Sequence, residues 1–177
     1  MRTLIKHSAL ALLVMAAGYN VAMADPVNIN ITGNVVASPC KVNNDSSTLN
    51  VDLGSGANSI QASTLAAAND GTTPKAFNLV LTECPSGTTS VKVTFTGTPD
   101  TAQPSMFANT GVAQPLAVEL SSTTGPAPGV RANNTSVTQP VVSGGVTYGL
   151  SARAVTPTGN VIPGDISSVV VANFTYN

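Results

Sequence analysis

Residues Val27–Val36 read V-N-I-N-I-T-G-N-V-V, and their pattern sets the expectation for the rest of the chain. Every second residue is apolar or glycine, and the residues between are Asn or Thr, up to the final pair of valines. Such a period of two is typical of an extended strand with one face turned to a hydrophobic surface. The stretch is therefore either the first strand of the chain's own sheet or a strand that pairs with another molecule. Its apolar face consists of Val27, Ile29, Ile31, Gly33 and Val35.

The residues before this stretch have the layout of an export signal. Arg2 and Lys6 are followed by the short apolar run Ala9–Ala17, which is too short to span a bilayer. An A-M-A sequence then ends at Ala24 and forms a cleavage site. We expect residues 1–24 to be a signal peptide, and the mature chain to begin at Asp25.

Charged side chains are few. The chain has seven Lys or Arg and eight Asp or Glu, and its formal net charge at pH 7 is −1. Binding to phosphate backbones needs clustered basic residues, so we expect no nucleic-acid partner. After the signal, the basic residues are scattered at Lys41, Lys75, Lys92, Arg131 and Arg153.

Cys40 and Cys84 are the only cysteines. An exported chain enters an oxidising compartment, so we expect them to form a disulfide, with two free thiols as the alternative. In the chain-entropy account, closing a loop of about 45 residues stabilises the fold by roughly 4 kcal/mol.

Short alternating segments bounded by Gly, Pro, Asn and Ser follow through the rest of the chain. They predict a single all-β sandwich of about seven or eight strands. Pro140 favours an edge position for its strand. Ile60–Ala68 is long enough for one or two helical turns, and Ser121–Asn134 is predicted to be a loop. The predicted strands are Thr48–Leu53, Lys75–Cys84, Ser90–Gly97, Pro115–Leu120, Val137–Val142, Val146–Val155 and Ile166–Tyr176.

Catalytic residue types are scarce. The only histidine, His7, lies in the predicted signal, which excludes Ser-His-Asp and Cys-His catalysis in the mature chain. The common histidine-based metal sites are excluded in the same way. The carboxylates do not cluster in the sequence, and only a glycosidase pair assembled by folding stays open. We therefore predict a protein that is not an enzyme and that needs no cofactor or metal.

Several segments together resemble the pilin subunits of bacterial chaperone–usher fimbriae of the type 1 kind. The resemblance extends over essentially the whole mature chain. It rests on I-N-I-T-G-N-V-V before Cys40, F-N-L-V-L-T-E-C ending at Cys84, V-K-V-T-F-T-G, P-L-A-V-E-L, Y-G-L-S-A-R-A-V and the final F-T-Y-N.

This resemblance implies an incomplete immunoglobulin-like β-sandwich, the pilin fold, whose missing last strand leaves a hydrophobic groove. Residues 25–37 would be an N-terminal donor-strand extension, and residues 38–177 would be the pilin domain. A periplasmic chaperone would fill the groove first, and the extension of the next subunit would then replace it. The groove and chaperone-contact strand would be formed by Val170, Ala172, Phe174, Tyr176 and Asn177.

The implied partners are other copies of the chain or sister pilins, the periplasmic chaperone and an outer-membrane usher. The protein would pass through the periplasm to the extracellular fimbrium, polymerise by donor-strand exchange and support cell adhesion. A minor tip or adaptor pilin, or a self-contained secreted β-sandwich that acts as a binding module, are the alternatives.

Two features of the sequence have two interpretations each. Gly33 marks either a bulge in an ordinary strand or, by resemblance, a position where the groove is too shallow for a side chain. The last strand is either a closing core strand or, by resemblance, the wall of the groove.

Overall fold

The computed structural model describes residues 28–35, 39–42, 48–124 and 128–177. The chain divides into two units, residues 1–34 and Val35–Asn177, and every strand found in the described residues belongs to the second. Ala24, Asp25 and Val27 lie outside the described residues, as does the proposed boundary between residues 37 and 38.

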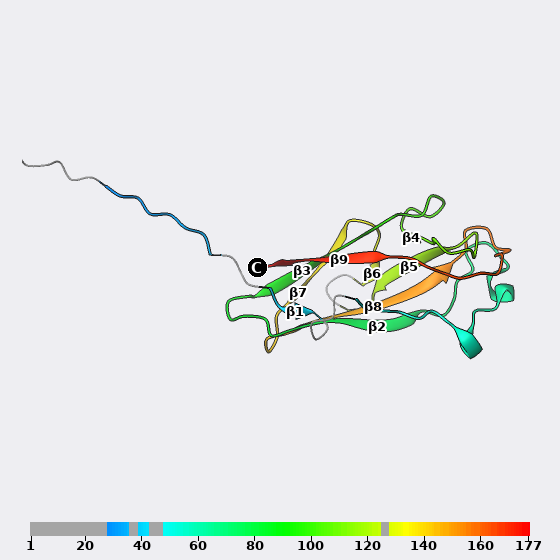
Figure 1. The fold of residues 1–177 in the computed structure, drawn as a ribbon, viewed down its shortest axis with the longest axis horizontal. Helices are drawn as coiled ribbons and strands as arrows, with labels where there is room; N and C mark the ends of the chain where they lie inside the picture. Colours follow the sequence, from blue (N-terminus) through cyan, green and yellow to red (C-terminus); the bar gives the residue numbers. More distant parts are fainter. Residues whose placement is uncertain (1–27, 36–38, 43–47, 125–127) are drawn as a thin grey trace, which may run out of the picture. The chain divides into compact units, whose positions relative to one another are not determined.

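Two antiparallel sheets form the second unit (Figure 1). The three-stranded sheet has the order β7 (Thr135–Pro140), β3 (Ser90–Gly97), β9 (Val170–Tyr176). The larger sheet has the order β1 (Lys41–Val42), β2 (Lys75–Thr82), β8 (Val146–Val155), β5 (Ala117–Ser122), β4 (Phe107–Ala108), and β6 (Gly129–Val130) also pairs with β5. Two short 3₁₀ helices, η2 (Gly56–Asn58) and η3 (Ala62–Leu65), lie between β1 and β2.

The main core lies between the two sheets. Alternate residues of β3 point inward and are fully buried, as the period of two in that strand requires. The Tyr148 hydroxyl on β8 crosses the core and donates a hydrogen bond of 2.6 Å to the carbonyl of Val91 on β3. This bond ties one sheet to the other at a buried point. The central members of the core are Leu79, Leu81, Val91, Val93, Phe95, Tyr148 and Leu150.

A second, smaller apolar cluster contains Leu65, Leu116 and Val161. The predicted strand Thr48–Leu53 is wrong, because this segment turns at Asp52 and packs against the second cluster without forming a strand. The Asp52 carboxylate accepts hydrogen bonds from the Gly54 N–H and from a serine hydroxyl two and three residues ahead, which turns the chain. These bonds lower the pKa of Asp52. Leu53 then packs against the second cluster and does not join a sheet.

Most of the other predicted strands are present, with shifted ends. Ser90–Gly97 and Val146–Val155 are confirmed in full, and Lys75–Cys84 ends at Thr82. Pro115–Leu120 is displaced to Ala117–Ser122, and Val137–Val142 to Thr135–Pro140. The last strand begins at Val170 rather than Ile166, because Ile166 packs against the second cluster. Of the one or two helical turns expected within Ile60–Ala68, the 3₁₀ helix Ala62–Leu65 forms, and β6 forms within the predicted loop Ser121–Asn134.

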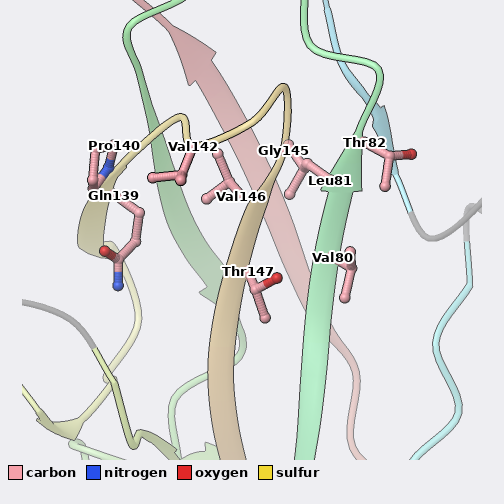
Figure 2. Close-up of a pocket in the computed structure, with 9 residues that line it drawn as sticks. All are labelled: Val80, Leu81, Thr82, Gln139, Pro140, Val142, Gly145, Val146 and Thr147. Atoms are coloured by element: carbon pink, nitrogen blue, oxygen red, sulfur yellow. The ribbon is translucent and has the colours of Figure 1, made fainter.

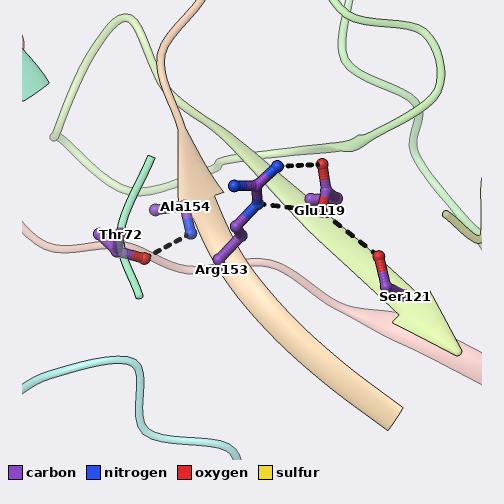
Figure 3. Close-up of polar contacts among 5 residues, drawn as sticks. All are labelled: Thr72, Glu119, Ser121, Arg153 and Ala154. Atoms are coloured by element: carbon purple, nitrogen blue, oxygen red, sulfur yellow. Dashed lines mark hydrogen bonds and ion pairs between the residues drawn. The ribbon is translucent and has the colours of Figure 1, made fainter. Parts of the chain in front are cut away.

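An ion pair joins β5 and β8 (Figure 3). Arg153 donates through Nε and Nη2 to the two oxygens of Glu119, at 2.9 and 3.0 Å, and this bonding raises the pKa of Arg153. On the neighbouring residue of β8, the Ala154 N–H donates to the Thr72 hydroxyl at 3.0 Å. The Glu119–Arg153 pair thus joins β5 to β8, and the Thr72–Ala154 bond holds the segment before β2 along β8.

Candidate functional site

β9 is an edge strand of the three-stranded sheet, and among the described residues it pairs with β3 alone (Figure 1). Just beyond its end, the Asn177 N–H donates a hydrogen bond to the Ser90 carbonyl at 3.0 Å. The Ser90 N–H donates to the Asn177 carbonyl at 3.2 Å. Antiparallel pairs alternate between bonded and non-bonded positions. The backbone groups of every second residue, counting back from Tyr176, therefore point away from β3.

The side chains of these same residues face the core. They are Val170, Ala172, Phe174 and Tyr176, and they pack against the main core while staying only half-buried. Their direct partners on β3 include Val91, Val93 and Phe95, which are fully buried. We call the outward backbone groups and half-buried side chains of these four β9 residues the β9 edge. It combines unpaired backbone groups with a row of incompletely covered apolar side chains.

The Tyr176 end of the β9 edge is anchored to the N-terminal part of the domain. The Cys40 N–H donates a hydrogen bond to the Tyr176 hydroxyl, which acts against the rise in the pKa of Tyr176 that burial causes. Cys40 is itself bonded to Cys84, with 4.3 Å between the Cα atoms, so the predicted disulfide is confirmed. The rings of Phe174 and Tyr176 lie 6.4 Å apart on the same face.

Sequence reasoning placed all four residues on this strand but missed the contact between Tyr176 and Cys40. No sequence pattern signals that contact, because it joins a side chain to a backbone amide far away in the chain. The Asn177 backbone is hydrogen-bonded to Thr89 and Ser90, and the role of Asn177 in a chaperone contact stays a prediction.

The N-terminal stretch has a different character. Its described residues, 28–35, contain no strand. Ile29 is 80% exposed, Ile31 91% and Val35 98%. Apart from the two chain neighbours of Gly33, a Cβ atom added there would meet no atom of the described residues within 4 Å. Nothing in the described structure therefore requires glycine at position 33.

A shallow hollow of about 410 Å³ lies where β2, β7 and β8 approach one another (Figure 2). Its lining contains no ionisable side chain, and none of the predicted site residues belongs to it. Among the described residues, no three His, Cys, Asp or Glu side chains come close enough to hold a metal ion. In the same part of the chain, no helix is long and apolar enough to cross a membrane. The lining residues are Val80, Leu81, Thr82, Gln139, Pro140, Val142, Gly145, Val146 and Thr147.

The β-sandwich with its β9 edge is the fold of one class of protein, which comparison with known proteins identifies. Residues 29–177 match the fimbrial protein family, so the chain belongs to that family. It is a fimbrial subunit of the chaperone–usher class and a component of an extracellular pilus, and it is not an enzyme. Pilin subunits of this class polymerise with other pilins.

Two curated relatives are similar over nearly their whole length. Protein FimG of Escherichia coli K12 is 32% identical over 172 residues, which cover 95% of each chain. The S-fimbrial adhesin protein SfaS of Escherichia coli O6:K15:H31 is 35% identical, covering 88% of each chain.

Solved structures show the same fold at lower identity. The P pilus rod subunit PapA is 19% identical, with a TM-score of 0.61, covering 79% of this chain and 100% of that one. A subunit in the structure of a chaperone–usher pilus is 18% identical, also with a TM-score of 0.61, covering 86% and 96%. The predicted all-β pilin fold is thereby confirmed.

Proposed function

We propose that the chain is a structural subunit that polymerises by donor-strand exchange through the β9 edge. The N-terminal extension of another subunit lies along β9, and the chain's own extension, residues 25–37, is donated to a further subunit. The observation that supports this is the β9 edge itself. Its unpaired backbone groups and half-buried apolar row match an incoming strand that is apolar at every second residue.

The apolar face of the extension supplies much of the binding energy. Each fully buried Val or Ile side chain contributes roughly 1.5–3 kcal/mol, as an upper estimate. Ile29, Ile31 and Val35 are almost fully exposed in the isolated chain, so nearly all of this burial is still available to a partner. Backbone hydrogen bonds to the outward groups of β9 add to the joint and fix its register.

Before assembly, the same edge requires a partner. Residues 1–24 direct export, and a periplasmic chaperone covers the β9 edge until the next extension replaces it at the outer-membrane usher. Tyr176 and Asn177 form the chaperone-facing end of the strand. An uncovered sheet edge with exposed apolar surface is prone to aggregation, so we expect the chain to be degraded or to aggregate in the periplasm without its chaperone.

The position within the fibre has two candidates. The rod is favoured by the low content of charged residues, which suits a surface largely buried in an assembly. A minor tip or adaptor position is favoured by the 35% identity to a protein named a fimbrial adhesin. Immunogold labelling separates them, because a rod subunit is labelled along the whole fibre and a tip subunit only at its end.

Gly33 provides the test of strand exchange. We expect Gly33→Val to leave the yield of chaperone-bound subunit unchanged, since a side chain there meets nothing in the described structure. Fibre yield should fall at least tenfold, because the added side chain faces the acceptor. Quantitative electron microscopy of fibres measures the change.

Thr32→Val is the matched control, since it adds an apolar side chain to the opposite face of the extension. We expect fibre yield for this variant within twofold of wild type. Normal fibre yield from Gly33→Val would contradict the placement of this residue against the acceptor.

A further inference from the structure

Two exposed apolar side chains lie in adjoining segments close to the start of β9. Val112 is 67% exposed and Ile162 is 63% exposed. The segments that carry them are joined by backbone hydrogen bonds from Ile162 to Gln114 at 2.7 Å and from Ala113 to Asp165 at 3.1 Å. We call Val112 and Ile162 the apolar tip. A third bond, from the Thr110 N–H to Ser167 at 2.7 Å, continues the pairing toward Val170.

The apolar tip is held rigidly by a buried asparagine. The Asn109 amide donates to the Ala113 carbonyl at 2.6 Å, and its oxygen accepts from the N–H groups of Gly111 and Ser167 at 2.9 and 2.8 Å. A Cβ atom on Gly111 would collide with the carbonyl oxygen of Asp165. The two segments therefore pack too closely for a side chain at this point. The exposure of Val112 thus belongs to a surface that hydrogen bonds and close backbone packing hold in place.

The length of the chain limits where a donor subunit can lie. This step rests on the proposed strand exchange. Five peptide units separate Val35 from Cys40, and an extended chain covers at most about 3.6 Å per residue, or about 18 Å in all. The sandwich of the donor must therefore lie against one end of the acceptor's β9 edge.

Both ends carry exposed apolar side chains, but in different surroundings. At the Tyr176 end, the Tyr176 hydroxyl already bonds to Cys40, the neighbouring surface carries the ion pair between Lys41 and Glu83, 3.0 Å apart, and Val142 is exposed in a separate turn. At the Val170 end lies the apolar tip, where two exposed side chains are carried by segments that are hydrogen-bonded to each other. We propose that the apolar tip is a second contact between successive subunits, on which the sandwich of the donor packs.

The test compares a whole donor subunit with the extension alone. The acceptor is the chaperone-bound chain carrying Val112→Ser and Ile162→Ser, and the donors are the complete subunit or a synthetic peptide of residues 25–37. We expect the exchange rate and affinity of the peptide to stay within twofold of wild type, since the peptide has no sandwich. The joint with a complete subunit should dissociate about tenfold faster in denaturant.

Val142→Ser is the matched control. Val142 is also 67% exposed, but its neighbour Val141 bonds to Thr89, which in turn bonds to Asn177 at the opposite end of β9. We expect this variant to behave as wild type with both donors. Faster dissociation from Val142→Ser, or none from the double variant, would overturn the proposal. If the peptide fails to bind the wild-type chain, strand exchange itself is wrong, and the apolar tip proposal falls with it.

Discussion

The two outer strands of the three-stranded sheet, β7 and β9, differ sharply although both pair with β3. On β7, Val137 is the one fully buried side chain, only 4% exposed, and most of the other residues are polar. On β9, four apolar side chains line the inner face and all of them stay half-buried. β7 therefore leaves little apolar surface exposed at its edge of the sheet, whereas β9 leaves a row of apolar side chains incompletely covered.

The backbone of β7 is also less able than that of β9 to pair with a further strand. Pro140 on β7 lies opposite Ser90, whose N–H and carbonyl both bond to Asn177. The missing N–H of Pro140 therefore costs no hydrogen bond to β3 and leaves a poor edge for another strand, as edge prolines do elsewhere. β9 contains no proline. The comparison shows that one edge is protected against pairing and the other is available for it.

The largest expected effect comes from removing the anchor of the β9 side. Cys40→Ser with Cys84→Ser releases the segment that bonds to Tyr176. We expect the free energy of unfolding of the peptide-bound domain to fall by roughly 4 kcal/mol. Denaturant titration with a bound peptide of residues 25–37 measures it. A loss below about 1 kcal/mol would mean that the disulfide contributes little to this side of the sandwich.

A proline substitution on each of the two outer strands tests directly which strand binds the donated peptide. By the antiparallel alternation, the N–H groups of Ala172 on β9 and Thr138 on β7 both point away from β3. Ala172→Pro removes a donor that an incoming strand needs, so we expect peptide affinity to fall at least tenfold. Thr138→Pro should leave the affinity within twofold of wild type. Fluorescence anisotropy with labelled peptide measures both, and equal losses would refute the assignment of β9 as the binding edge.

The smallest expected effect comes from loosening β3, the central strand with which both β7 and β9 pair. Tyr148→Phe removes the buried hydrogen bond to Val91 and should lower the free energy of unfolding by about 1 kcal/mol at pH 7. Peptide affinity should not change beyond twofold, because the bond does not lie on either edge. The same denaturant titration gives the loss.

The pH dependence of this variant follows from the pKa of Tyr148, which burial raises above its ordinary value. The folded state favours the neutral phenol, so its stabilising effect is complete below pH about 10 and is lost as the pH rises beyond that. The stability of wild type should therefore decline more steeply above pH 10 than that of Tyr148→Phe. Parallel declines would show that Tyr148 does not titrate differently on folding. Burial also raises the pKa of Tyr176, so some alkaline decline remains in the variant.

Strand positions were predictable where alternation alone decides the structure. Ser90–Gly97 and Val146–Val155 lie in the middle of their sheets, and their ends coincide with the limits of the pattern. Thr48–Leu53 has the same alternation but forms no strand, because the turn at Asp52 and the packing of Leu53 prevail. Alternation reports which residues face an apolar surface, and it does not identify that surface.

The candidate site was predictable in its members but not in its geometry. The period of two placed Val170, Ala172, Phe174 and Tyr176 on one face, which the structure shows. Their half-burial follows from the edge position of β9, which has a strand on one side only among the described residues, and only the three-dimensional arrangement reveals it. The apolar tip had no sequence signal either, since Val112 and Ile162 are brought into adjoining segments by hydrogen bonds between two distant loops.

The long register between β3 and β9 has a mechanical consequence. Seven consecutive residue pairs, from Val91–Tyr176 to Gly97–Val170, join the last strand to the centre of its sheet. A force directed along β9 loads all of these pairs together, whereas a force across the sheet opens them one after another. The domain should therefore withstand tension along this strand far better than a force that peels β9 away from β3 across the sheet.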